Sequence, residues 1–218
     1  MEYCNFGSLH QRVFSIPIDE LNIWKIIKQL ANAIAYLHSK NIIHGDIKPL
    51  NVLLSKNENQ TMTLKLADFG SSYDKSETEI DEFKAEHFIG TEIYTPPEVL
   101  RNETFGKPAD IWSFGATIAF VCNRGHLFLT KQGIRSWTGK KSPINSLGSS
   151  RYSKDLHLLV MGMLQPDPKK RPTAEVILIV ASNKYSVTTR LTQSADFQPP
   201  SAEPFNTDFN SDFSYLKH

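Results

Sequence analysis

Apolar residues recur at intervals of three and four between Asp19 and Ser39. This spacing places them on one face of an α-helix. Pro17 and the acidic residues Asp19 and Glu20 suit the start of such a helix, where free backbone amides and the positive end of the dipole lie. The pattern predicts a core helix over residues 19–39, whose buried face consists of Leu21, Ile23, Ile26, Ile27, Leu30, Ala31, Ile34 and Leu37.

Shorter regular patterns follow along the chain. Residues 64–67 alternate as a strand does, after a polar turn at residues 57–61. Residues 109–122 are almost wholly apolar, which predicts a helix buried on all sides. Another helical face spans residues 156–164, a turn spans residues 166–171, and a last helix is expected at residues 174–181. Residues 123–150 carry no regular pattern.

The composition changes after Lys184 to Ser, Thr, Asn, Pro and Asp. So polar a segment cannot build a core, and we expect one domain at residues 1–184 followed by a disordered tail at residues 185–218. The pair Asp-Phe occurs three times in this tail, ending at Phe197, Phe209 and Phe213. These pairs are either docking motifs for a regulatory protein partner or a coincidence of spacing.

Composition and charge narrow the classes of function. A net charge of +1 and a pI near 7.8, with scattered lysines, predict binding to neither nucleic acid nor an anionic membrane. Two distant cysteines, Cys4 and Cys122, suit a reducing compartment, and no basic, apolar leader opens the chain, so we expect a cytoplasmic protein. The apolar runs are far shorter than the roughly 20 residues that span a bilayer.

Residues 43–54 carry the strongest chemical signal in the chain. Within eight positions they place His44, Asp46, Lys48 and Asn51 between apolar residues, and Asp68-Phe69-Gly70 follows the predicted strand. Phosphoryl transfer requires little covalent chemistry from a protein. A carboxylate to orient a hydroxyl, a cation near the phosphoryl group and ligands for a divalent metal cover much of the task.

These motifs resemble the HRDxKxxN catalytic loop and the DFG metal-binding loop of the eukaryotic protein kinase family. Further landmarks follow in the family's order, namely residues 90–98 (GTEIYTPPE), 110–115 (DIWSFG) and 171–173 (RPT). The resemblance covers about residues 1–184 and implies an α+β fold: the mainly helical C-terminal lobe of a kinase, with a hinge strand, short β-hairpins and no small N-terminal lobe. Gly45 stands where the family usually has Arg.

The resemblance assigns roles to the polar residues of the two loops. Asp46 would orient the acceptor hydroxyl and receive its proton, while Lys48 would reach the transferring phosphate and marks the Ser/Thr-directed type. Thr91 would hydrogen-bond both side chains. Asn51 and Asp68 would hold Mg²⁺. Taken alone, Asp46 and Asn51 could instead be a turn carboxylate and amide.

The first residues resemble the hinge that binds ATP. Glu2 and Cys4 would contact the adenine through their backbone, Ser8 the ribose, and Leu53 would pack under the adenine ring. The alternative is an N-terminal strand followed by a turn at residues 7–8. ATP and Mg²⁺ are therefore the expected cofactors.

Several residues are expected to support the loops. By the resemblance, His44 would bond to the backbone of the metal-binding loop and Asp110 would accept amides of the catalytic loop. Glu98 would pair with Arg171 in a partly buried ion pair. Phe69 is interpreted as a core residue.

Residues 71–89 occupy the place of a kinase activation segment. In most relatives a phosphate on this segment is paired by the catalytic-loop Arg. Gly45 cannot form this pair, so we predict that control by a phosphate bound at residue 45 is absent.

The substrate class is expected to be protein Ser or Thr, and two alternatives stand beside it. His-Gly-Asp followed by Asn also resembles aminoglycoside and choline phosphotransferases, although these usually carry His at the position of Lys48 and lack the later landmarks. The family's Gly-rich loop, strand lysine and helix glutamate precede the hinge and are not found in this sequence. We therefore expect either a truncated piece of a complete kinase or a noncatalytic single-lobe binding module, and the intact Asp46, Lys48, Asn51 and Asp68 favour the first.

Overall fold

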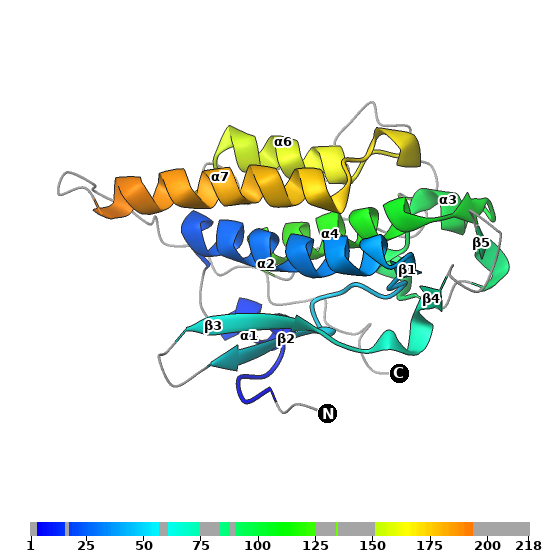
Figure 1. Ribbon diagram of the computed structural model, residues 1–218, viewed down its shortest axis with the longest axis horizontal. Helices are drawn as coiled ribbons and strands as arrows, with labels where there is room; N and C mark the ends of the chain where they lie inside the picture. Colours follow the sequence, from blue (N-terminus) through cyan, green and yellow to red (C-terminus); the bar gives the residue numbers. More distant parts are fainter. Residues whose placement is uncertain are drawn as a thin grey trace, which may run out of the picture.

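The computed structural model describes residues 4–15, 18–56, 61–74, 83–87, 90–124, 134 and 151–193. Within these residues, a group of α-helices lies against pairs of short antiparallel strands (Figure 1). The architecture is therefore α+β and mainly helical, as the sequence predicts.

Helix α2 (Glu20–Ser39) lies at the centre of the fold. Its first turn is capped by Asp19, whose Oδ1 accepts a hydrogen bond from the amide of Asn22 at 2.7 Å. The buried face includes Ile23, Ile27 and Ile34, which are fully buried, so the predicted amphipathic helix is confirmed.

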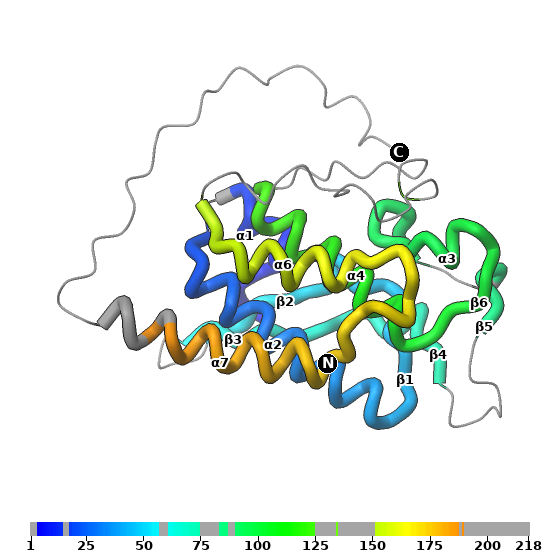
Figure 2. The backbone as a smooth tube through the Cα atoms, turned by 90° about the horizontal axis from the view of Figure 1, so that it is seen from above, coloured from blue at the N-terminus to red at the C-terminus, as the bar shows by residue number. Residues whose placement is uncertain are grey.

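Three further long helices complete the core. Helix α4 (Lys107–Cys122) is buried from Ala109 to Cys122, as its apolar sequence predicts. Helix α6 (Lys154–Met163) lies beside α4, and α7 (Ala174–Gln193) runs alongside α2 (Figures 1 and 2). A Cβ at Gly115 of α4 would lie 2.9 Å from the Cβ of Met163, so the absence of a side chain lets α4 and α6 pack closely. Helices α1 (Leu9–Ser15) and α3 (Pro97–Leu100) are shorter.

Strands surround the two loops that carry the polar motifs. Strands β2 (Val52–Lys56) and β3 (Met62–Leu66) form an antiparallel hairpin in which Val52 pairs with Leu66. Strand β1 (Ile42–Ile43) pairs with β4 (Tyr73–Asp74), and β5 (Phe83–Lys84) pairs with β6 (Thr104–Phe105). The single-turn 3₁₀ helices are η1 (Phe69–Ser71), η2 (Ala85–His87), η3 (Glu92–Tyr94) and η5 (Pro168–Lys170).

Helix α7 is longer than the last helix that the sequence predicts. It continues to Gln193, well beyond residue 181, so residues 185–193 of the segment expected to be disordered are helical. Tyr185 packs against the core and lies 5.5 Å from the ammonium group of Lys28 on α2. This contact with α2 stabilises a turn that composition alone does not predict. The rest of the expected tail, residues 194–218 with its Asp-Phe pairs, lies outside the described residues.

A buried ion pair connects α3 to the turn before α7. Arg171 donates to both carboxylate oxygens of Glu98, each at 2.6 Å, which confirms the predicted pair. The guanidinium also lies 5.2 Å from the ring of Trp112 on α4. Three segments distant in sequence are thereby held together.

Among the described residues, none of the helices combines the length and apolar character needed to cross a lipid bilayer.

Candidate active site

The polar loop of residues 44–51 connects β1 to β2, and hydrogen bonds to Asp110 of α4 hold its first residues in place. The carboxylate of Asp110 accepts hydrogen bonds from the backbone amides of His44 and Gly45, both at 2.9 Å. Its Oδ2 also lies 2.9 Å from Nε2 of His38 at the end of α2. The predicted supporting role of Asp110 is confirmed, and the side chain is buried with all three of these donors around it.

His44 connects the loop of residues 44–51 to the residue that precedes Asp68. Its Nε2 lies 3.1 Å from the carbonyl oxygen of Ala67, and its Nδ1 accepts from the amide of Asp46 at 3.3 Å. Because a carbonyl can only accept, the proton of the neutral imidazole is on Nε2. Burial lowers the pKa of His44 despite the nearby Asp110 carboxylate, which keeps the ring neutral at pH 7. The predicted bond to the metal-binding loop is therefore confirmed.

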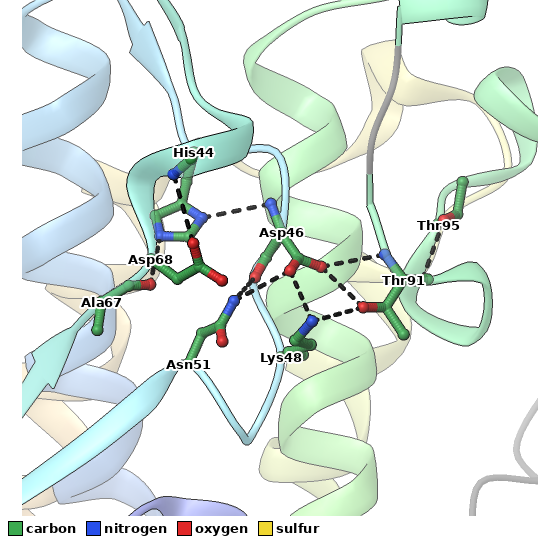
Figure 3. A network of polar contacts seen from close by, with 9 residues as sticks. His44, Asp46, Lys48, Asn51, Ala67, Asp68, Thr91 and Thr95 are labelled. Atoms are coloured by element: carbon green, nitrogen blue, oxygen red, sulfur yellow. Dashed lines mark hydrogen bonds and ion pairs between the residues drawn. The ribbon is translucent and has the colours of Figure 1, made fainter. Parts of the chain in front are cut away.

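Asp46 lies at the centre of the site (Figure 3). Its Oδ1 accepts from the amide of Thr91 at 3.0 Å and from the Thr91 hydroxyl at 2.9 Å. Its Oδ2 accepts from Lys48 Nζ at 2.6 Å and from Asn51 Nδ2 at 3.1 Å. Burial by itself would raise the pKa of Asp46, but the hydrogen bonds from Lys48 and Thr91 outweigh it and lower the pKa. Asp46 is therefore an anion at neutral pH.

Lys48 completes a closed triangle with Asp46 and Thr91. Its ammonium group donates to Thr91 Oγ1 at 2.7 Å as well as to Asp46. An ammonium group has three donors, and within the described part of the chain the third has no acceptor. The Lys48 side chain is 18% exposed, so this donor can reach a bound anion.

Asn51 and Asp68 lie together at the open end of the β2–β3 hairpin. Asn51 directly precedes β2, Asp68 follows β3 by two residues, and the amide of Ala67 donates to the Asn51 carbonyl at 2.9 Å. Asn51 uses its amide group on the backbone carbonyl and carboxylate of Asp46, which leaves its side-chain oxygen for a cation. Asp68 is exposed and accepts only a long bond from Gly70, at 3.4 Å, within the described residues.

These two oxygen donors fit Mg²⁺, which typically takes one or two side-chain ligands and completes its shell with phosphate and water. No group of three or more His, Cys, Asp or Glu that could hold a metal by itself occurs in the described ranges. The pair is therefore suited to a metal that arrives with a phosphate ligand.

Phe69 differs from its predicted place in the core. Its side chain is 46% exposed and contacts the ring of His44, with 4.9 Å between centroids. The preceding residue, Asp68, has a left-handed backbone with φ of 67°, which turns the chain into η1 and directs Phe69 away from the apolar core.

The predicted nucleotide contacts are placed only in part. Glu2 lies outside the described residues, whereas Cys4 is half-buried and precedes a segment that runs beside β2. Ser8 forms a bridge with Leu53, which brings these two predicted contacts together. The Ser8 hydroxyl accepts a long hydrogen bond, 3.4 Å, from the amide of Gln11 and so begins helix α1. A role for Cys4, Ser8 and Leu53 in binding a nucleotide stays a prediction.

Two hydrogen bonds that support the segment around Thr91 were not predicted from the sequence. The hydroxyl of Thr95 donates to the carbonyl of Thr91 at 3.0 Å, and Ser113 of α4 donates to the carbonyl of Tyr94 at 2.8 Å. Both side chains are buried and fix the segment that presents Thr91 to Asp46. Ser113 could have been found, because a polar residue inside an apolar helix needs a partner.

Comparison with known proteins identifies the family to which this fold and site belong. The model of the protein kinase domain matches residues 1–181, so the chain belongs to the protein kinase family. Its relatives include CBL-interacting serine/threonine-protein kinase 10 of Arabidopsis thaliana, with 33% identity over 79% of this chain and 35% of the relative. Serine/threonine-protein kinase Nek5 of Mus musculus is 30% identical over 82% of this chain and 28% of the relative.

A third relative, serine/threonine-protein kinase D1044.8 of Caenorhabditis elegans, is 33% identical over 71% of this chain and 15% of its own length. The chain thus spans about a third or less of the length of the relatives that it matches.

Proposed function

We propose that the protein transfers the γ-phosphoryl group of ATP to Ser or Thr hydroxyls of cytoplasmic protein substrates. The observation that carries this proposal is the closed network of Asp46, Lys48 and Thr91 beside the oxygen pair of Asn51 and Asp68. A binding module needs neither an ionised carboxylate with a hydroxyl partner nor a lysine with an unused donor beside it. The family relationship supports the same chemistry.

Asp46 is the group that orients the acceptor hydroxyl and takes its proton. The carboxylate accepts four hydrogen bonds in the structure, which is about the number of lone-pair sites that a carboxylate offers. An incoming hydroxyl can therefore bind only if one donor leaves. We infer that the donor that leaves is Lys48, since a phosphate oxygen competes for the same ammonium group.

In this exchange, phosphate binding to Lys48 prepares the Asp46 carboxylate to accept the substrate hydroxyl. When Lys48 turns toward a phosphate, the lone-pair site that it leaves on Oδ2 of Asp46 can accept the substrate hydroxyl, while Asn51 still donates to Oδ2 and Thr91 to Oδ1. The carboxylate then keeps its orientation but loses a positive neighbour that lowers its pKa, which makes it a better base. The lysine thereby serves both partners of the reaction in turn.

Asn51 and Asp68 are proposed to hold Mg²⁺, which would neutralise charge on the ATP phosphates. We propose that Cys4, Ser8 and Leu53 contact the nucleoside, since Ser8 and Leu53 form a bridge and the segment after Cys4 runs beside β2. The proposed contact of Glu2 lies outside the described residues. Positioning and charge stabilisation account for most of the catalysis in such a reaction.

The test is phosphoryl transfer by the longest natural form of the protein that contains this chain. With γ-labelled ATP, Mg²⁺ and a general protein substrate, label should appear on Ser and Thr, and Asp46→Asn should lower the rate about 100-fold or more. Asp155→Asn, at an exposed ion pair with Lys184 remote from the site, is the matched control and should keep the wild-type rate.

Two other outcomes would overturn the proposal. Label on choline or an aminoglycoside, with none on protein, would indicate a small-molecule phosphotransferase. Absence of both labelling and any thermal shift with ATP and Mg²⁺ would indicate a noncatalytic binding module.

A further inference from the structure

Three aromatic side chains pack together beside the candidate active site. The rings of Tyr73, Phe83 and Phe105, termed here the aromatic cluster, have centroids 5.0 Å apart for Tyr73 and Phe105, 5.1 Å for Tyr73 and Phe83, and 5.7 Å for Phe83 and Phe105. Phe105 is buried against Val99 and Ala109, whereas Tyr73 and Phe83 are half-buried and pack onto this base. Each ring comes from a different strand, namely β4, β5 and β6.

The cluster joins both ends of the segment that connects Asp68 to Thr91. Tyr73 lies five residues after Asp68, and its strand pairs with β1, which leads into the catalytic loop. Phe83 lies eight residues before Thr91, and its strand pairs with β6 in front of α4. Residues 71–74 and 83–87 therefore meet in the same three rings.

Gly45 is the residue that lets Tyr73 lie so close to the catalytic loop. Its backbone is left-handed, with φ of 81°, and a Cβ at this position would lie 2.9 Å from Cε2 of Tyr73 and would collide with the carbonyl oxygen of Ser71. No L-residue side chain fits there without moving the start of the segment. The same glycine donates its amide to Asp110, so the loop itself cannot shift away.

We propose that the aromatic cluster holds residues 71–74 and residues 83–87 together without a phosphate, and that Tyr73 and Phe83 are positioning residues for Asp68 and Thr91. This inference rests on the proposed function only for its effect on rate. The contacts are between neutral rings, so the arrangement needs no charge at residue 45 and persists in unmodified protein.

Hydrogen exchange tests the cluster without depending on catalysis. Tyr73→Ala removes two ring contacts, and we expect amides of residues 71–74 and of residues 83–87 to exchange about tenfold faster. Tyr73→Phe keeps the ring and should restore wild-type protection. Phe83→Ala should have the reciprocal effect on residues 71–74. Protection in α4 is the reference for global stability and should not change.

Coupling between the two ends is the decisive observation. If Tyr73→Ala accelerates exchange only in its own strand, or if Phe83→Ala leaves residues 71–74 protected, the cluster does not join the ends and the inference is wrong. It is also wrong if phosphatase treatment of the wild-type protein removes protection from both segments, because a phosphate would then hold them.

Catalysis provides a separate arm in the longest natural form of the protein. Tyr73→Ala should lower kcat about tenfold with KM for ATP changed less than about threefold, and Tyr73→Phe should restore kcat. A wild-type protein without phosphoryl transfer would overturn the proposed function alone, since the exchange experiment would still decide on the cluster. Active protein whose kcat is insensitive to Tyr73→Ala, with both segments deprotected, would overturn the positioning role.

Discussion

Two ion pairs of equal length in this molecule have different surroundings. Arg171 and Glu98 approach to 2.6 Å, and so do Lys48 and Asp46. The Arg171 and Glu98 side chains are 0% and 2% exposed, whereas Lys48 is 18% exposed beside a 7% exposed Asp46. Distance alone therefore does not tell which pair is structural and which can take part in chemistry.

The difference lies in how many donors are already used. Arg171 donates to both oxygens of Glu98 and to the carbonyls of Pro108, Gln165 and Pro166, so all five of its N–H groups are bonded. Lys48 uses two donors, on Asp46 and Thr91, and keeps the third. A buried pair whose donors are all used stabilises the fold, while a partly exposed pair with an unused donor can exchange partners.

The largest effect is expected at the buried pair. Glu98→Ala leaves the Arg171 guanidinium buried without its counter-charge, which should lower the free energy of unfolding by about 3–5 kcal/mol. Urea denaturation of this chain measures the loss. The matched control is Asp155→Ala at the exposed pair with Lys184, where we expect less than about 1 kcal/mol. Equal losses for the two variants would contradict the contrast between buried and exposed pairs.

Gly45 donates its amide to the buried Asp110 and directly precedes Asp46, so its substitution should have the next largest effect. Gly45→Ala imposes a left-handed backbone on alanine and brings its Cβ against Ser71 and Tyr73, so we expect a loss of about 2 kcal/mol in unfolding free energy. Gly162→Ala is the matched control, because nothing lies within 4 Å of its added Cβ and it is inside helix α6. That variant should gain up to about 1 kcal/mol. Denaturant midpoints that shift alike for both would show that residue 45 is not constrained.

Thr91 belongs to the partly exposed site, so its loss should be seen more in rate than in stability. Thr91→Val removes the hydroxyl that bridges Asp46 and Lys48 but keeps the shape. We expect a drop of about tenfold in phosphoryl transfer and a stability loss of about 1 kcal/mol. Thr63→Val on the exposed face of β3 is the control for both measurements. A loss of several kcal/mol with unchanged rate would place Thr91 with the buried structure instead.

The sequence predicts those parts of the fold in which one segment determines its own structure. Helix α2 follows from its periodicity, and the apolar run of α4 indicates a buried helix before any contact is known. The contacts of Asp110, His44 and Glu98 follow from motif resemblance, since the loops keep the family's spacing.

The remaining features depend on contacts between distant segments. The packing of Tyr73 on Gly45 requires β1 to pair with β4, which no local pattern indicates. Helix α7 extends past residue 181, where Tyr185 contacts Lys28 of α2. Phe69 is exposed because the preceding residue, Asp68, has a left-handed backbone. The Asp-Phe-Gly motif alone does not predict this backbone angle.

The smallest effect is a pH dependence that distinguishes the buried support from the carboxylate of the site. The folded state lowers the pKa of His44 below its ordinary value of 6.5, so the unfolded chain takes up the proton first as the pH falls. Stability should therefore decrease as the pH falls below about 6.5, by at most about 1.4 kcal/mol per pH unit from this group. The lowered pKa of Asp46 affects stability only near and below its ordinary value of 3.8, outside the range from pH 7.5 to 5.

Urea midpoints across this range should fall less steeply in His44→Gln, which keeps a donor for the Ala67 carbonyl, than in the wild type. Among the described residues, burial also lowers the pKa of His10, so His10→Gln measures how much of the slope comes from that group. Equal slopes for wild type and His44→Gln would show that His44 is not the group that titrates.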